Sequence, residues 1–141
     1  GSETMGGTSS VCADVKARGN ALFAEGKYEE AVEAYTRALE ASGQDQTLWS
    51  NRSAARLKLG HYGFALADAL SCVHLAPRWA KSYFRLASAF LAAGRPVEAA
   101  DNFRRALALS PTDATILTSL KACEEKSEGV RGRGYVYFWG Q

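Results

Sequence analysis

Small and apolar residues return along this chain with a period of 34 positions. The columns that keep this step hold mainly alanine, glycine, aromatic and aliphatic residues. They are Gly26, Gly60 and Gly94; Ala31, Ala65 and Ala99; Tyr35, Ala69 and Phe103; Ala38, Cys72 and Ala106; and Leu39, Val73 and Leu107. A repeat of this length is typical of arrays in which each unit is one pair of helices.

Within one repeat, apolar positions follow the period of an α-helix. Ala31, Ala34, Tyr35 and Ala38 form the i, i+3, i+4 stripe of an amphipathic helix. Gly26 lies before this stripe, where a left-handed glycine would end the preceding helix. Extended to all three repeats and the segment after them, the pattern predicts seven helices, at about 11–25, 28–42, 45–59, 62–75, 79–93, 96–109 and 112–126.

The segment after the third repeat, from Asp113 to Lys126, is apolar on one face and charged on the other. Repeat arrays need such a terminal element, because it covers the apolar surface of the last unit. We therefore expect an all-α fold with three helix-turn-helix repeats and a C-terminal capping helix, stacked as a right-handed superhelix (an α-solenoid). The first helix of each pair would line a concave groove.

Composition and the absence of catalytic motifs exclude several classes of function. The chain has 141 residues, 47% of them apolar, and a net charge of +2, which favours one ordinary globular domain and no nucleic-acid or membrane partner. Its three cysteines, Cys12, Cys72 and Cys123, are too widely spaced to indicate a disulfide framework or a zinc site. No nucleophile elbow, phosphate loop or paired-histidine motif is present. We expect no metal, no cofactor and no catalytic residues, in a cytoplasmic or nuclear protein that is a monomer.

A string in the first repeat resembles a known consensus. It reads Gly19-Asn20-Ala21-Leu22-Phe23, then Gly26-Lys27-Tyr28, Ala31, Tyr35 and Ala38-Leu39. This string is similar to the tetratricopeptide repeat (TPR), a family of 34-residue helix pairs, and the resemblance covers residues 12–126. Gly43 in place of a loop proline and Cys72 in place of an alanine are mild departures.

Five polar residues lie on the expected first helices of the three repeats: Lys16, Asn20, Asn51, Lys81 and Arg85. Lys16 and Asn20 are four residues apart, and so are Lys81 and Arg85, so each pair shares one helix face. Lysine, arginine and the amide of asparagine all donate hydrogen bonds to anions. This set therefore favours a ligand with carboxylates, such as the C-terminus of a peptide.

The same five residues resemble the two-carboxylate clamp of co-chaperone TPR domains. That resemblance implies binding of the Glu-Glu-Val-Asp tail of cytosolic heat-shock chaperones of the seventy- and ninety-kilodalton classes. By the same resemblance, Lys16, Asn20 and Asn51 would hold the terminal carboxylate. Lys81 would hold the aspartate side chain, and Arg85 would hold the peptide nearby.

Other interpretations remain open. Each of the five residues taken alone could be an ordinary solvated side chain. Apolar pockets that select one chaperone could lie around Phe23, Leu57 and Phe84, although we rank these three as core residues first. The chain could also be a general scaffold for an unrelated peptide, or the targeting domain of a larger enzyme or exchange factor.

The two ends differ from the repeats. We expect residues 1–10 to be a flexible segment with the look of an expression-tag remnant, 11–127 to be the TPR domain, and 128–141 to be a linker and aromatic tail. Residues 134–140 alternate like a β-strand and resemble one strand of the chromosome-condensation-regulator propeller repeat. The tail could thus begin a further domain, be disordered, pack on apolar surface of this chain, or occupy a neighbour's groove.

Overall fold

A computed structural model describes the backbone of residues 2–139 and the side chains of residues 11–129. Within that backbone the chain forms helices and turns only, which confirms the all-α expectation. The helices are α1 (Ser2–Ala24), α2 (Tyr28–Ala41), α3 (Gln46–Lys58), α4 (Tyr62–Leu75), α5 (Ala80–Ala92), α6 (Pro96–Leu109) and α7 (Ala114–Trp139).

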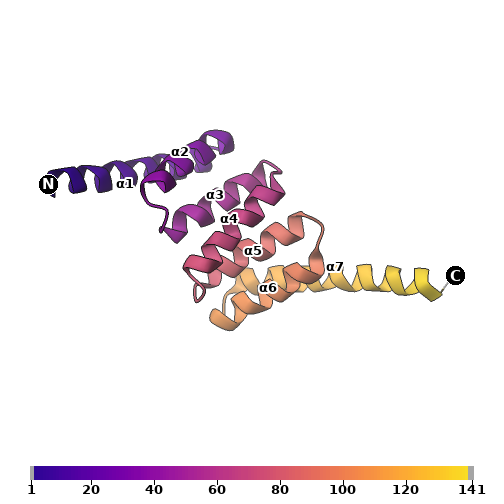
Figure 1. Cartoon of the computed structure of the whole chain (residues 1–141). Coiled ribbons are helices and arrows are strands. Elements are labelled where there is room, and N and C mark those ends of the chain that lie inside the picture. The colour runs from indigo at the N-terminus through magenta and orange to yellow at the C-terminus, as the bar shows by residue number, and fades with distance from the viewer. Residues whose placement is uncertain (1, 140–141) are drawn as a thin grey trace.

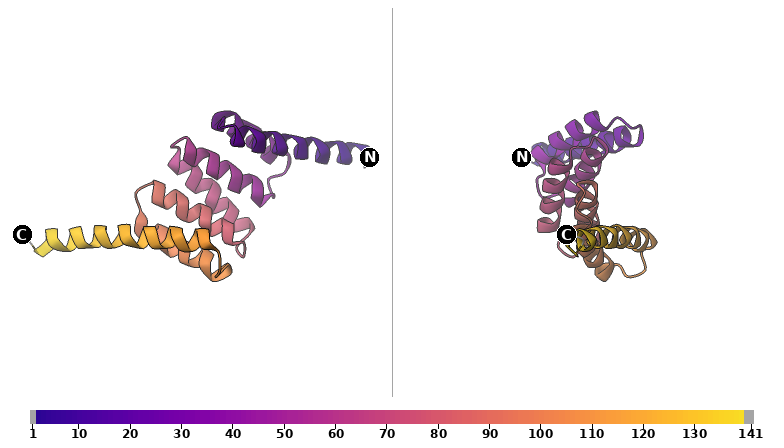
Figure 2. Two further views of the ribbon diagram at one scale, coloured as in Figure 1. Left: turned by 180° about the vertical axis from the view of Figure 1, so that it is seen from behind. Right: turned by 90° about the vertical axis from the view of Figure 1, so that its right-hand side faces the viewer.

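The helices stack in chain order, so that the two ends of the chain lie at opposite ends of the array (Figure 1). Each helix packs on the next one, and α3 also packs on both α1 and α5. The first helices of the three pairs therefore form one continuous layer. The terminal helices α1 and α7 extend beyond this stack in opposite directions (Figure 2).

The turn inside each repeat is made by a glycine in the left-handed region. Gly26, Gly60 and Gly94 have φ angles of 79°, 78° and 79°. A side chain would be strained at this angle, so glycine is the residue that ends the first helix without cost. The first helix of each repeat therefore ends at a glycine with the same backbone conformation.

Small residues let the helices approach closely. Ala31, Ala65 and Ala99 are fully buried, each on the second helix of its pair. Two large rings, Tyr35 and Phe103, fill the space beside these alanines in the first and third repeats. The period read from the sequence is thus the period of the core.

The middle repeat has a buried ionic contact that the hydrophobic pattern does not reveal. Asp68 of α4 is 2% exposed and accepts from Arg52 Nη2 and Arg56 Nη1 of α3, both at 2.8 Å. Two guanidinium groups satisfy both oxygens of this carboxylate, as a buried charge requires. The contact joins α3 to α4, the two helices of the middle repeat.

Both terminal helices are longer than the sequence predicts. Helix α1 begins at Ser2 rather than near residue 11, and α7 continues to Trp139 rather than ending near residue 126. The strand expected over 134–140 is wrong as far as Trp139, and residue 140 lies outside the described part of the chain. A lone strand leaves its backbone groups unpaired, whereas a helix pairs them locally. The division of the chain into 1–10, 11–127 and 128–141 stays a prediction.

None of the helices in the described backbone has the length and apolarity needed to cross a membrane.

Candidate functional site

A hollow of about 190 Å³ lies where helices α1, α3 and α5 meet the ring of Tyr35. It is lined by Asn20, Phe23, Tyr35, Asn51, Ala54 and Arg85. Three of the five residues predicted to form the site are therefore brought together here, from three different repeats. The other two, Lys16 and Lys81, do not line this hollow.

The two asparagine amides are joined to each other. Asn51 Nδ2 donates to Asn20 Oδ1 at 3.0 Å, and the hydroxyl of Tyr35 donates to the same oxygen at 2.7 Å. Because the Asn20 oxygen accepts twice, its amide nitrogen is turned away from both contacts. This arrangement leaves the Asn20 N–H groups oriented to donate to a further acceptor.

The hydroxyl of Tyr35 helps to fix this orientation of the Asn20 amide. Burial raises the pKa of its hydroxyl from the ordinary 10.0 to about 12, although the positive charge of Arg85 acts in the opposite direction. The hydroxyl is therefore a proton donor at neutral pH. Gly19 makes the close approach of the ring possible, since a Cβ there would lie 2.6 Å from Tyr35 Cε1.

Arg85 lines the hollow and links α5 to α3. Its Nε donates to Ser50 Oγ at 3.0 Å, and its guanidinium carbon lies 5.9 Å from the centre of the Phe84 ring. Burial lowers the pKa of the guanidinium below its ordinary value. An arginine nevertheless keeps its charge at neutral pH, so the hollow contains a permanent cation.

Lys81 lies one turn before Arg85 on α5 and is exposed. Its Nζ lies 5.7 Å from the centre of the Trp79 ring. Lys81 lines a second hollow, of about 230 Å³, between α5 and the start of α7. The rest of its lining is Ala80, Phe84, Asp113, Thr115 and Ile116.

Lys16 is paired with an acidic side chain that the sequence reasoning missed. Its Nζ lies 2.9 Å from Asp45 Oδ2. Asp45 is the N-cap of α3, and its other oxygen accepts from the backbone N–H and the hydroxyl of Thr47. An aspartate directly before a predicted helix is a recognisable capping signal, but its contact with Lys16, 29 positions away, is a tertiary contact.

The aromatic residues ranked first as core do reach the groove. Phe23 lines the first hollow and also packs edge-on against Tyr28, with 5.2 Å between ring centres. Phe84 lines the second hollow and packs against Phe103. Each ring therefore lines a hollow and also packs against the core, which makes both rings candidate apolar contacts for a ligand.

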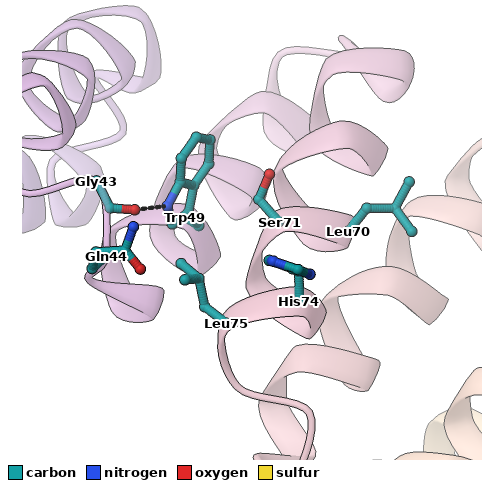
Figure 3. Close-up of a pocket in the computed structure, with 7 residues that line it drawn as sticks. All are labelled: Gly43, Gln44, Trp49, Leu70, Ser71, His74 and Leu75. Atoms are coloured by element: carbon teal, nitrogen blue, oxygen red, sulfur yellow. Dashed lines mark hydrogen bonds between the residues drawn. The ribbon is translucent and has the colours of Figure 1, made fainter.

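A third hollow, of about 390 Å³, is chemically different (Figure 3). It lies between the α2–α3 loop, Trp49 and the second half of α4, and Trp49 Nε1 donates to the Gly43 carbonyl at 2.9 Å. Its lining is Gly43, Gln44, Trp49, Leu70, Ser71, His74 and Leu75. With neither lysine nor arginine among these seven residues, this hollow offers no permanent positive charge to a carboxylate.

The cysteines take no part in these hollows. Cys72 and Cys123 are buried, Cys12 is half-buried, and all three are free thiols. Burial raises the pKa of Cys72 and of Cys123. Cys72 and Cys123 are thus buried, protonated thiols.

Comparison with known proteins agrees with the geometry. A family model described as "TPR repeat" matches residues 19–60, and one described as "Tetratricopeptide repeat" matches residues 80–113. The Hsp70-Hsp90 organizing protein of Triticum aestivum is 40% identical over 107 residues, which are 76% of this chain and 18% of that protein. Serine/threonine-protein phosphatase T of Trypanosoma brucei brucei is 34% identical over 112 residues, 79% of this chain and 24% of the relative.

A solved structure extends the comparison to three dimensions. The second TPR domain of human RPAP3, solved in complex with the HSP70 peptide SGPTIEEVD, superimposes with a TM-score of 0.78 at 33% identity. The match covers 83% of this chain and 98% of that domain. The chain spans less than a quarter of the two curated relatives but nearly the whole of the solved domain. The repeat period, the glycine turns and these matches together show that the chain belongs to the tetratricopeptide repeat family.

Proposed function

We propose that this domain binds the C-terminal Glu-Glu-Val-Asp peptide of heat-shock chaperones of the seventy- and ninety-kilodalton classes. The observation that carries the proposal is the convergence of Asn20, Asn51 and Arg85 in one hollow. Two side-chain amides that can donate hydrogen bonds line this hollow, and the guanidinium supplies a permanent positive charge. Lys16 and Lys81 extend the same donor strip on α1 and α5.

In the proposed clamp, these five residues bind different parts of the peptide. Lys16, Asn20 and Asn51 hold the terminal carboxylate of the peptide. Lys81 holds the side chain of the last aspartate, and Arg85 holds the adjacent part of the peptide. Two carboxylates on one residue match two groups of donors on neighbouring helices.

Known proteins support the choice of ligand. The RPAP3 domain named above was solved with a peptide that ends in Glu-Glu-Val-Asp, and the wheat relative is named as an organizing protein of Hsp70 and Hsp90. Because this chain matches nearly all of that solved domain, a similar ligand is the simplest proposal for its groove.

Energetics set the expected strength. A hydrogen bond to a charged group contributes roughly 1.5–3 kcal/mol net, so a few of them give micromolar binding of a short peptide. Lys81 is exposed, so its share is screened by salt over about 10 Å. Affinity should therefore fall as ionic strength rises.

Titration with two forms of one peptide tests the proposal. The peptide ends in Glu-Glu-Val-Asp, and its C-terminus is either the free acid or an amide. Amidation removes one of the two carboxylates and the partner of the asparagine amides, so we expect the free acid to bind at least tenfold more tightly by isothermal titration calorimetry. Equal affinity for the two forms would rule out the clamp and leave the domain as a scaffold for a different peptide.

A second, compatible role is that of an adaptor. The match to phosphatase T covers only 24% of that relative, which places a domain like this one within a protein named as an enzyme. We infer that this domain is an adaptor that recruits chaperones to a longer protein in the cytosol. Affinity purification of the full-length protein with wild-type and Lys81→Ala domains, followed by blotting for the two chaperones, tests this role. Chaperone recovery that does not depend on Lys81 would contradict it.

A further inference from the structure

The contact between Lys16 and Asp45 places an internal carboxylate at the proposed clamp. The two charged atoms are 2.9 Å apart, and the side chains are only 30% and 28% exposed. Solvent screens a pair this sheltered less than it screens a fully exposed pair. The carboxylate of Asp45 therefore balances much of the positive charge of Lys16 within the domain.

Asp45 is held in this position by its role as a helix cap. Thr47 donates to Oδ1 through its backbone N–H at 2.9 Å and also through its hydroxyl. Burial alone would raise the pKa of Asp45, but the hydrogen bonds from Thr47 and Lys16 outweigh burial and hold that pKa below its usual value. The side chain is therefore an anion at neutral pH, fixed at the start of α3 beside the groove.

The other lysine of the strip is not held in an ion pair. Asp113 lines the same hollow as Lys81, but its Oδ1 accepts from the backbone N–H groups of Thr115 and Ile116. The residue 34 positions after Asp45 is Trp79, which is the N-cap of α5 and lies under Lys81 as a neutral ring. Among the residues that the structure describes, no carboxylate oxygen lies within 4.0 Å of Lys81 Nζ. An incoming carboxylate therefore finds Lys16 already in an ion pair, whereas Lys81 is in none.

We propose that Asp45 sets the affinity of the groove by competing with the ligand's carboxylate for Lys16. This inference rests on the proposed function, because it concerns the same clamp. A bound terminal carboxylate must share the ammonium group with Asp45 and accept a second anion nearby. Asp45 thereby weakens binding and restricts the groove to ligands whose remaining contacts, at Arg85 and Lys81, are also satisfied.

Asp45→Asn is the test, because asparagine caps a helix as well as aspartate does. The variant keeps the oxygen that accepts from Thr47 and replaces only the charged partner of Lys16. We expect the free-acid peptide to bind about three- to tenfold more tightly, with an unchanged melting temperature. The gain should be larger for the free acid than for the amidated peptide, both measured by competition against one labelled peptide.

A matched control separates this effect from net charge. Asp101→Asn removes an exposed aspartate on α6 that pairs with Arg104 at 3.0 Å, outside the strip. It changes the formal charge by the same amount, and we expect less than a twofold change in affinity. Asp45→Ser, which also retains a capping oxygen, is the second variant if the asparagine form is unstable.

The outcomes are distinct. Unchanged or weaker binding by Asp45→Asn and Asp45→Ser, an equal gain from Asp101→Asn, or equal gains for the acid and amide peptides would each overturn the role of Asp45. If the wild-type domain does not distinguish acid from amide, the clamp itself fails and this inference fails with it. Discrimination by the wild type without a gain from Asp45→Asn leaves the clamp intact and refutes only the competition.

Discussion

Lys16 and Lys81 belong to the same proposed clamp, yet their ammonium groups have different neighbours. Lys16, on α1, lies 2.9 Å from the carboxylate of Asp45, which caps α3. Lys81, on α5, lies 5.7 Å from the centre of the neutral Trp79 ring, and Trp79 occupies the equivalent cap position of its own repeat. Lys16 is thus part of an ion pair, whereas Lys81 is not, although Asp113 lines the hollow beside Lys81.

This difference shows how a repeat protein becomes asymmetric. The turns of the three repeats are alike, since their glycines have nearly identical φ angles. The cap column reads Asp45, Trp79 and Asp113, and of these three residues Asp45 alone forms an ion pair with a lysine of the strip. We expect Lys81 to contribute more binding energy than Lys16, and the following experiments test that order.

Lys81→Ala should have the largest effect. It removes a cation that forms no ion pair in the described part of the chain, so binding of the free-acid peptide should weaken by about 1.5–3 kcal/mol, or roughly 10- to 150-fold. Lys81 is exposed, so the melting temperature should not change. Calorimetry and thermal unfolding on one sample check both statements. An affinity within twofold of wild type would remove Lys81 from the clamp.

Gly19→Ala should disturb the α1 end of the strip without changing any charge. The added Cβ would lie 2.6 Å from Tyr35 Cε1, and overpacking of this kind costs about 1–3 kcal/mol of folding free energy. Denaturant unfolding measures the loss, and peptide titration should show weaker binding because Tyr35 orients Asn20. Gly63→Ala is the control, since nothing lies within 4 Å of its Cβ. Equal stability of the two variants would mean that the ring is not confined by Gly19.

Lys16→Ala should weaken binding less than Lys81→Ala does, by about 1 kcal/mol or less, because Asp45 already shares the charge of Lys16. Repeating the substitution in the Asp45→Asn domain sharpens the comparison. In the Asp45→Asn domain the ligand is the only anion that pairs with Lys16, so removing Lys16 should cost more binding free energy than it does in the wild-type domain. A loss from Lys16→Ala as large as that from Lys81→Ala in the wild-type domain would contradict the inequality of the two lysines.

Alkaline titration comes last because it acts only well above neutral pH, at the hydroxyl that orients Asn20. The pKa of Tyr35 is raised to about 12 in the fold, from 10.0, so the folded state holds this proton more tightly than the unfolded state. Its stabilising contribution is complete below about pH 10 and is lost as the pH rises from 10 to 12. Ultraviolet absorbance of tyrosinate should show one late-titrating tyrosine, absent from Tyr35→Phe. Identical titration curves for the two proteins would contradict the assignment.

The period of 34 made the helix pairs, their glycine turns and the buried alanine column predictable, because each depends on residues close together in the chain. The donor strip followed from the same period, since helices at equivalent positions in a stack lie side by side. The structure confirms the stack and brings Asn20, Asn51 and Arg85 to one hollow. Their role in binding, and that of the two lysines, stays a prediction.

Other features could not be predicted from local pattern. The alternation of aromatic and small residues near the C-terminus predicted a strand, but a strand is stable only beside another strand, and the backbone there continues α7 to Trp139. The buried pairing of Asp68 with Arg52 and Arg56 was not predicted, because charged residues on a helix usually face solvent.

Hydrophobic spacing thus decides which segments become helices and in what order they stack, since helix periodicity and the turn glycines act within a few residues. The electrostatic character of the groove depends instead on contacts between residues far apart in sequence. Asp45 meets Lys16 across 29 positions, and Tyr35 meets Asn20 across 15. Charge interacts through space rather than along the chain, and for that reason only the folded arrangement distinguishes the two lysines.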